Sequence, residues 1–477
     1  MTKRAPSLPE RISPQATDPA ARVDSAGHSA AHSPLREVVA RPRSFGGLDL
    51  TRWLLALNCA WVGYDFTVLA PWFGRWNDGF TPTTDTLAEQ ILLPRAVLSL
   101  LPTFWHVSGW LPPALLITSS FFAIAAGLRR SRFEGPALWL AAFLLLAVIL
   151  RYPRLYSQAD WWLFYCLVFA NLARNRPSPW AVVWRLQCVA VYFFAGINKW
   201  MEPAWRTGDA VRYALYIPFA AFPRAEKFAH LPAWVYFALA VATIGQRVGI
   251  SWLLFLPDGT RSLFGWVRRA SALSFALMHV SYMLLLDVGT FSTVGLACLP
   301  GLLEDPRKQV GEIDLGRRAR KLWLAVATAC AVFFAAPLHW IPRPAWISAD
   351  TFDRVLTFAP RWDMFVRIGS EQVVMRYRVL YGADGAFWYD PMLGFLRQNP
   401  YGELHPNPFR WNGYLWNWRL RLWIENLIGA SQDLTTTSPR PALVQRFSDV
   451  MFTEFSPPEL EGEKRERAAI TFFIIDR

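Results

Sequence analysis

The residues of this chain most able to do chemistry are isolated ionisable groups in strongly apolar surroundings. Lys199 lies near the end of the run "YFFAGINKW" (192–200), His279 lies inside a later apolar run, and Asp160 opens another. Ionisable groups inside a membrane are costly, so they usually face a bundle interior, a cavity or each other. A lysine whose charge is disfavoured by burial can act as a base, whereas one at a membrane-helix end can reach the lipid headgroups. Both interpretations are open for Lys199.

Structural roles are the alternatives for the other ionisable residues. A lone histidine inside a bundle, such as His279, can be a hydrogen-bonding core residue. An aspartate at a helix start, such as Asp160, can be a solvated residue that interacts with the helix dipole. Arg185 and Arg247 are the other ionisable residues predicted inside spans. Position alone does not choose between these roles and catalysis.

The composition is typical of a membrane protein. Of 477 residues, 53% are hydrophobic, 15% are aromatic and only 18% are charged, with 25 tryptophans and 34 phenylalanines. Soluble globular domains carry more charge. The net charge of +13 is scattered between apolar segments and forms no basic stripe beside a nucleic-acid-binding motif. We therefore expect membrane lipid as a partner and no nucleic acid.

Common metal, nucleotide and hydrolase motifs are absent from the sequence. It contains no HExxH zincin motif, no P-loop and no GxSxG nucleophile motif. The five cysteines stand singly inside apolar segments, without a CxxC pair, at Cys59, Cys166, Cys188, Cys298 and Cys330. Cysteines in such positions are typical of small buried core residues, so we predict no metal site.

Nine apolar segments approach the length of about 20 residues that a bilayer requires of a helix. They are residues 53–73, 110–128, 136–150, 161–173, 180–198, 232–256, 270–286, 289–303 and 322–341. The sequence therefore predicts a mainly α protein, a polytopic membrane helical bundle of about nine spans, within residues 49–342. Most Lys and Arg of the loops fall on the side of the amino terminus, which places that side in the cytoplasm. We expect the protein in the inner (cytoplasmic) membrane.

The two ends of the chain differ from its apolar middle. Residues 1–48 are rich in Pro, Ala, Ser and Arg without periodic apolar residues, which predicts a disordered cytoplasmic tail. Residues 343–477 contain the alternating run "VVMRYRVLY" (373–381), a DG turn before "AFWYD", a tryptophan-rich stretch at helical spacing (409–423) and the apolar run "AAITFFII" (468–475). We expect a small C-terminal α+β domain, and an odd number of spans makes it extracytoplasmic.

Three short motifs are similar to those of one membrane family. The run at 192–200, followed by "WRTG" (205–208), resembles a segment of vitamin K-dependent gamma-carboxylase in which an apolar run leads to a catalytic lysine. "HVSYMLLLDVGTFS" (279–292) resembles a carboxylase segment with a histidine, then a glycine and a phenylalanine. "FAPRWDMF" (358–365) resembles a signature of bacterial members of the horizontally transferred transmembrane domain (HTTM) family, which includes the carboxylases.

The resemblance implies roles for individual residues. In the carboxylases a neutral lysine deprotonates a reduced naphthoquinone, and Lys199 matches that lysine. His279 and Asp160 would assist it, with Asp160 standing about where the carboxylase has a further histidine and many bacterial relatives have an acidic residue. A reduced, vitamin K-like quinone would be the cofactor. The matched positions expected near it are Asn198, which replaces the first of two adjacent lysines, and Trp205, Gly289 and Phe291.

Two functions follow from the resemblance. One is a quinol-linked, gamma-glutamyl carboxylase-like enzyme that modifies a peptide at the outer membrane face. The other is a non-catalytic membrane factor for maturation or export of a secreted peptide or toxin, as family members are linked to toxin production. A transporter lacks support, because the sequence shows no inverted internal repeat.

Overall fold

The chain is mainly helical in the part that the structure describes. The computed structural model describes residues 45–75, 110–151, 158–174, 180–215, 230–256, 263–286 and 288–305, single residues at 225, 228, 345 and within 321–329, and strand residues 371–381, 387–390, 395–397 and 465–476. The prediction of a mainly α chain is confirmed for these residues. Outside them lie the tail up to residue 44, most of the ninth predicted span (322–341), the motif at 358–365 and the tryptophan-rich stretch at 409–423.

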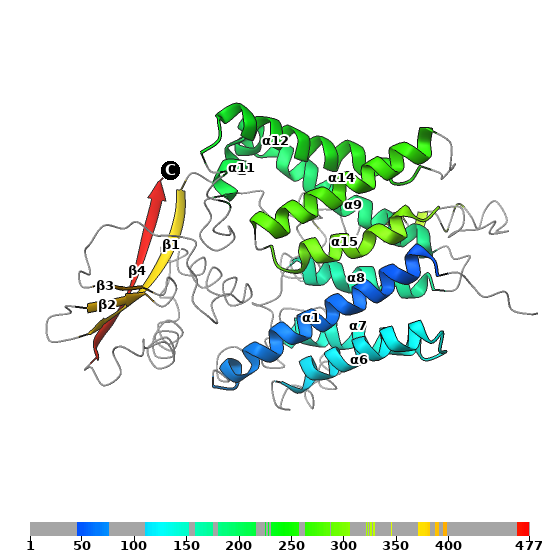
Figure 1. Cartoon of the computed structure of the whole chain (residues 1–477), viewed down its shortest axis with the longest axis horizontal. Helices are drawn as coiled ribbons and strands as arrows, with labels where there is room; N and C mark the ends of the chain where they lie inside the picture. The colour runs from blue at the N-terminus through cyan, green and yellow to red at the C-terminus, as the bar shows by residue number, and fades with distance from the viewer. Residues whose placement is uncertain are drawn as a thin grey trace, which may run out of the picture. The chain divides into compact units, whose positions relative to one another are not determined.

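Eight of the nine predicted spans coincide with helices in the described ranges (Figure 1). The helices are α1 (Gly47–Arg75), α6 (Leu111–Leu128), α7 (Glu134–Arg151), α8 (Gln158–Leu172), α9 (Trp180–Met201), α10 (Pro203–Thr207), α11 (Asp209–Ala214), α12 (Ala233–Gly245), the π-helix η2 (Gln246–Ile250), α13 (Ser251–Leu253), α14 (Leu263–Leu285) and α15 (Thr290–Leu303). The largest difference is at α14, which begins seven residues before the predicted boundary at 270. Arg268 lies in this additional length of helix and is buried.

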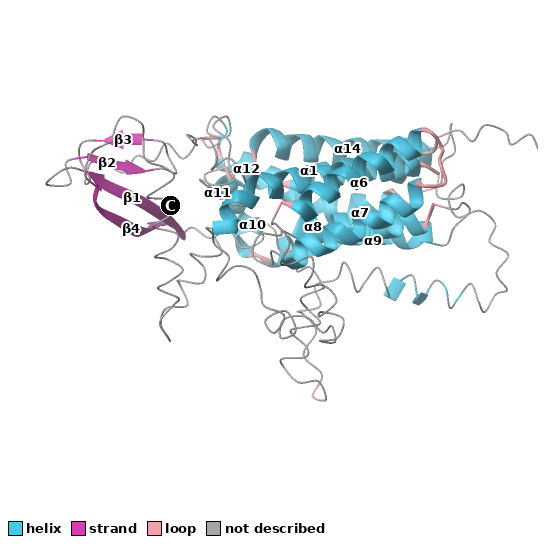
Figure 2. Ribbon diagram, turned by 90° about the horizontal axis from the view of Figure 1, so that it is seen from below, coloured by secondary structure: helices cyan, strands magenta, loops and turns pink. Residues whose placement is uncertain are grey.

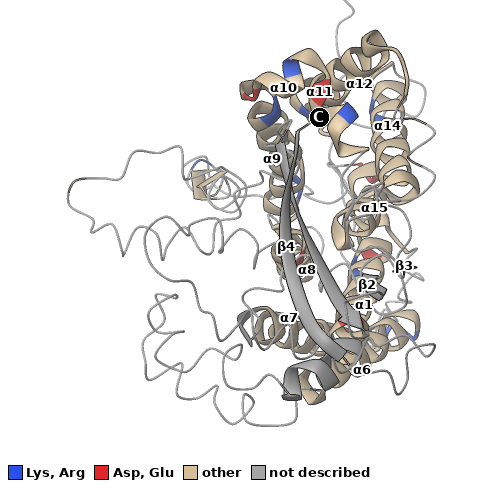
Figure 3. Ribbon diagram, turned by 90° about the vertical axis from the view of Figure 1, so that its left-hand side faces the viewer, with Lys and Arg blue, Asp and Glu red and all other residues tan. Residues whose placement is uncertain are grey.

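Three of the described helices are long and apolar enough to cross a membrane: α6, α9 and the continuous helix from Ala233 to Leu253. Glu134–Ile149 and Thr290–Leu303 are shorter apolar helices. Large apolar side chains, including Phe122, Trp234 and Trp266, are exposed on the bundle surface, and most of the helical ribbon carries no charge (Figure 3). This surface suits an apolar solvent better than water, which supports the membrane character expected from composition.

The longer helices pack side by side as a bundle (Figure 2). The helix α1 packs against α6, α7, α8 and α15, while α9 packs against α8, α12 and η2. The core between them is large and apolar, with Trp162, Trp184, Tyr192 and Phe275 fully or almost fully buried. Helices that are buried among apolar neighbours need apolar residues on every side, which explains why the predicted spans are apolar almost throughout.

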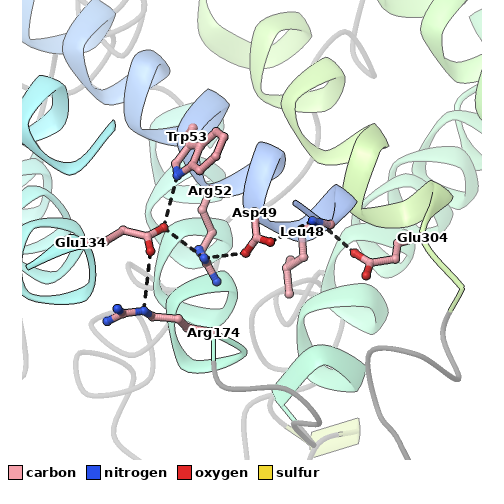
Figure 4. Close-up of polar contacts among 8 residues, drawn as sticks. Leu48, Asp49, Arg52, Trp53, Glu134, Arg174 and Glu304 are labelled. Carbon is pink, nitrogen blue, oxygen red and sulfur yellow. Dashed lines mark hydrogen bonds and ion pairs between the residues drawn. The ribbon is translucent and has the colours of Figure 1, made fainter. Parts of the chain in front are cut away.

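Buried ion pairs connect helix ends at one side of the bundle (Figure 4). The Arg52 guanidinium at the start of α1 donates to Asp49 Oδ1 (2.7 Å) and to Glu134 Oε1 (3.0 Å) at the start of α7. The Trp53 indole also donates to Glu134 Oε1 (3.2 Å), and Arg174, after α8, lies 3.7 Å from Glu134 Oε2. One buried carboxylate thus joins three segments that are far apart in sequence.

Arg185 extends this polar end through backbone carbonyls. Its guanidinium donates to the carbonyl oxygens of Gly301 (2.8 Å), Leu302 (3.1 Å) and Glu304 at the end of α15, and to that of Leu254 (3.3 Å) after α13. The last carbonyls of a helix lack partners within the helix, so an arginine there satisfies acceptors and complements the helix dipole. Arg185 is therefore a structural residue. The starts of α1, α7 and α9 and the ends of α8, α13 and α15 all lie at this end of the bundle.

Four strands form one antiparallel sheet in the order β3-β2-β1-β4. They are β1 (Glu371–Tyr381), β2 (Phe387–Asp390), β3 (Phe395–Arg397) and β4 (Arg465–Asp476). In the backbone register, Leu380 pairs with Trp388 between β1 and β2, and Met375 pairs with Phe472 between β1 and β4. The strands β1, β2 and β4 occupy the segments for which the sequence predicted a hairpin and a final strand, whereas β3 was not predicted.

Candidate functional site

Lys199 lies in the last turn of α9, where its side chain is only 1% exposed. The chain turns directly after α9: Pro203 occupies the first turn of α10, and Gly208, with φ of 92°, separates α10 from α11. This turn places the Trp205 ring against the lysine, with Lys199 Nζ 4.6 Å from the ring centroid. A cation over an indole face is attracted by the ring electrons. The Lys199 side chain is therefore held inside the fold.

The lysine lines a cavity of about 740 Å³, a size typical of small-molecule sites. The wall is formed mainly by apolar residues of α11, α12 and α14, together with Trp205, Arg247, Met278 and Tyr282. Leu239 of α12 and Leu277 of α14 also line it, and these side chains are 46% and 59% exposed at the bundle surface. The cavity thus reaches the apolar outside of the bundle between these two helices.

Arg247 is the second cation of the cavity wall and is 4% exposed. It lies on η2, a π-helical turn inside the continuous helix from Ala233 to Leu253, and such turns are frequent at functional sites. The turn packs tightly on α9, because a methyl group added at Gly196 would lie 2.8 Å from Arg247 Cβ. Arg247 Nη2 donates to the Tyr282 hydroxyl (3.0 Å) and lies 3.9 Å from Met278 Sδ.

His279 is fully buried one layer behind this wall. Its Nε2 forms a 2.7 Å hydrogen bond with the hydroxyl of Tyr192, and its Nδ1 has no hydrogen-bond partner among the described residues. Its ring centroid lies 6.4 Å from that of Tyr282, whose hydroxyl accepts from Arg247. The histidine therefore contacts the cavity wall through an aromatic neighbour and is not itself among the lining residues.

Asp160 belongs to a separate polar contact at the start of α8. It is fully buried, and Thr290 Oγ1 donates to its Oδ1 at 3.2 Å. Gly289, with φ of 59°, makes the turn into α15, and Phe291 packs its ring 5.3 Å from the His279 ring. Asp160 therefore supports the α8–α15 junction and does not line the lysine cavity.

The structure divides the seven predicted site residues between these places. Lys199 and Trp205 both line the cavity. The contacts among α8, α14 and α15 contain four of the others, His279, Phe291, Gly289 and Asp160. Asn198 is buried beside the lysine but is not among the lining residues described. Sequence reasoning marked Arg247 as an ionisable residue inside a span but assigned it no role. It also missed the two tyrosines, which carry no signal in an apolar sequence.

Three thiols also lie together in the core, although their spacing in the sequence does not predict this contact. Cys166 of α8 lies with its Sγ 3.9 Å from that of Cys188 of α9 and 3.7 Å from that of Cys298 of α15, and all three are buried. Three thiols are a ligand set for soft ions such as Cu(I) or Zn²⁺. Packed thiols reach the same separations as small apolar groups, so the geometry by itself assigns no ion.

Comparisons with protein-family models, with curated proteins and with solved structures each found no match.

Proposed function

We propose that the chain is an integral membrane protein of the HTTM family and that it is a quinol-linked enzyme with Lys199 as general base. The observation that carries the proposal is the placement of Lys199, buried at the wall of an apolar cavity that reaches the bundle surface. A lipid-soluble quinol entering between α12 and α14 would reach this amine without crossing water. An interfacial lysine, the alternative considered from sequence, would extend its amine to the headgroups.

The chemistry required of Lys199 is a proton transfer. Lys199 Nζ would accept the proton of a quinol hydroxyl and become an ammonium. Only a neutral amine can do this, and apolar surroundings favour neutral amines in general. The Trp205 ring, 4.6 Å away, then stabilises the ammonium that forms. The reduced quinone supplies the redox chemistry of any later step.

His279 acts in this proposal as a positioning residue. It holds Tyr192 on α9, two turns before Lys199, and contacts Tyr282 of the cavity wall. Asp160 holds the start of α15 through Thr290. Both therefore fix the helices that carry the cavity.

The proposed membrane arrangement has nine spans in the inner membrane. The end that contains Arg52, Glu134 and Arg185 would face the cytoplasm, because most loop arginines and lysines lie on that side. Lys199, at the opposite end of α9, would then lie near the outer face, where a secreted peptide is available as second substrate. The C-terminal domain would be extracytoplasmic.

The test is quinol consumption by the purified full chain in lipid nanodiscs, supplied with a reduced naphthoquinone and oxygen. We expect Lys199→Gln to lose turnover while keeping the wild-type melting temperature within a few degrees. Arg206→Gln is the matched control, since Arg206 is an exposed cation next to Trp205. Unchanged turnover in folded Lys199→Gln would reject the enzyme and favour a non-catalytic maturation or export factor.

A further inference from the structure

Arg247 is a buried cation without an acidic partner among the described residues. Its guanidinium contacts two neutral groups, a tyrosine hydroxyl and a thioether, and its Nε has no hydrogen-bond partner in the described part of the chain. A buried guanidinium without a counter-charge is costly and is retained only where something compensates it. By contrast, Arg52 in the same bundle pairs with two carboxylates.

The described residues that line the cavity beside Arg247 offer no negative charge to balance the guanidinium. The lining residues include the Arg247 guanidinium and the Lys199 amine, and none of those described is acidic. An apolar chamber with positive charge on its wall complements an oily molecule with a negative head, because the low dielectric strengthens the attraction.

The local fold holds Arg247 at this wall. The π-helical turn widens the helix at this point, and the close approach at Gly196 fixes it against α9. Tyr282 accepts from one guanidinium nitrogen and so orients the planar group, leaving Nε outside that bond. A planar fork fixed in this way suits an oxygen anion better than a flexible ammonium does.

We infer that Arg247 binds the anionic oxygen of an ionised quinol in this cavity. This inference rests on the proposed function and adds the charge state of the ligand and the residue that recognises it. When the quinol O–H proton passes to Lys199 Nζ, the oxygen retains the electron pair and becomes an anion, and Arg247 donates an N–H to that anion. Trp205 and Tyr282 provide aromatic walls for the flat ring.

The experiment compares two oxidised probes that cannot undergo the reaction. A 2-hydroxy-3-alkyl-1,4-naphthoquinone is an anion at neutral pH, and its methyl ether is a neutral compound with the same ring and chain. Binding of each to the full chain in nanodiscs is followed by quenching of tryptophan fluorescence. We expect the wild type to bind the anion at least about tenfold more tightly than the ether, the scale of one charge-assisted hydrogen bond.

Variants assign that preference to Arg247. Arg247→Gln should reduce the preference by about tenfold while ether binding stays as in the wild type, which shows that the cavity is intact. Arg247→Lys should keep part of the preference, and Arg206→Gln should keep all of it. If Arg247→Gln does not fold, the test is the preference for the anion over the ether in the wild type and its partial loss in Arg247→Lys.

Three results would overturn the inference: no preference for the anion in the wild type, a preference that survives Arg247→Gln, or binding of neither probe. A long-chain fatty acid and its methyl ester form a further arm. Discrimination between these two, without discrimination between the quinones, would identify a lipid carboxylate as the ligand and reject the quinol anion. Since no arm requires turnover, failure here leaves the Lys199 assay to judge the enzyme separately.

Discussion

Replacing Gly295 with alanine should displace His279, because the imidazole lies directly against this glycine. A methyl group added at Gly295 would lie 2.1 Å from His279 Nε2, 2.3 Å from Cε1 and 2.7 Å from Cδ2. Atoms of these types do not approach so closely, and the ring is enclosed by Tyr192 and Phe291. The substitution therefore forces a buried ring to move.

The cost has two parts. Overpacking of a well-packed core typically costs about 1–3 kcal/mol. Movement of the ring also breaks the 2.7 Å bond between His279 Nε2 and the Tyr192 hydroxyl, worth about 1 kcal/mol. We expect Gly295→Ala to destabilise the protein by about 2–4 kcal/mol in total. At about 2–4 °C per kcal/mol for a domain of this size, the melting temperature should fall by about 5–15 °C.

The assay is thermal unfolding in nanodiscs with a dye that fluoresces on reaction with thiols, since the described cysteines are buried and become reactive only on unfolding. Gly245→Ala is the matched control, because a methyl group there meets nothing within 4 Å. It should raise stability slightly, since alanine is favoured over glycine in a helix by about 0.5–1 kcal/mol.

A double substitution isolates the contact. With His279→Ala present, Gly295→Ala should cost much less, which gives a favourable coupling of about 1 kcal/mol or more between the two positions. Equal melting temperatures for Gly295→Ala and Gly245→Ala would refute the placement of His279, and with it the proposed role of that residue behind the cavity wall.

Two further predictions concern other parts of the bundle. Glu134→Gln should destabilise the protein by about 1.5–3 kcal/mol, because it removes one of the two carboxylates that pair with the buried Arg52 and leaves only Asp49. Asp209→Asn should change the melting temperature little, because the hydrogen bond of this half-buried side chain to Thr207 is exposed to solvent. A membrane-permeable maleimide should not label Cys166, Cys188 or Cys298 in the folded protein but should label all three after denaturation. Mass spectrometry of the labelled peptides checks this, and rapid labelling before unfolding would contradict the packing of the thiol cluster.

Helix positions could be predicted from sequence because apolar length is a local property. The predicted spans at 110–128 and 289–303 differ from α6 and α15 by one residue at most. The helix α14 begins at Leu263, seven residues before the span predicted from residue 270. Arg268 is buried there, with its guanidinium within 3.4 Å of the carbonyl oxygens of Leu256 and Glu304. Tertiary contacts of this kind are not visible in local composition.

The grouping of the site residues could not be predicted for the same reason. Lys199 and Trp205 are close in sequence, so a turn between them was enough to bring them together. Arg247 reaches the same cavity only because Gly196 lets two helices approach closely. The three thiols come from three helices, and no spacing rule relates Cys166 to Cys298. Such groupings depend on helix packing, which one sequence does not specify.

Buried charges with partners and the buried Arg247 lie at different parts of this bundle, and this separation makes the proposal testable. At one end of the bundle, Arg52 pairs with carboxylates that include Glu134, and Arg185 donates to helix carbonyls. These charges are therefore compensated within the protein. Arg247 contacts only neutral groups among the described residues. Substitution at the first end should therefore change the melting temperature in the absence of ligand. Substitution of Arg247 should change ligand selectivity more than stability, because removing an uncompensated buried charge also removes its desolvation cost.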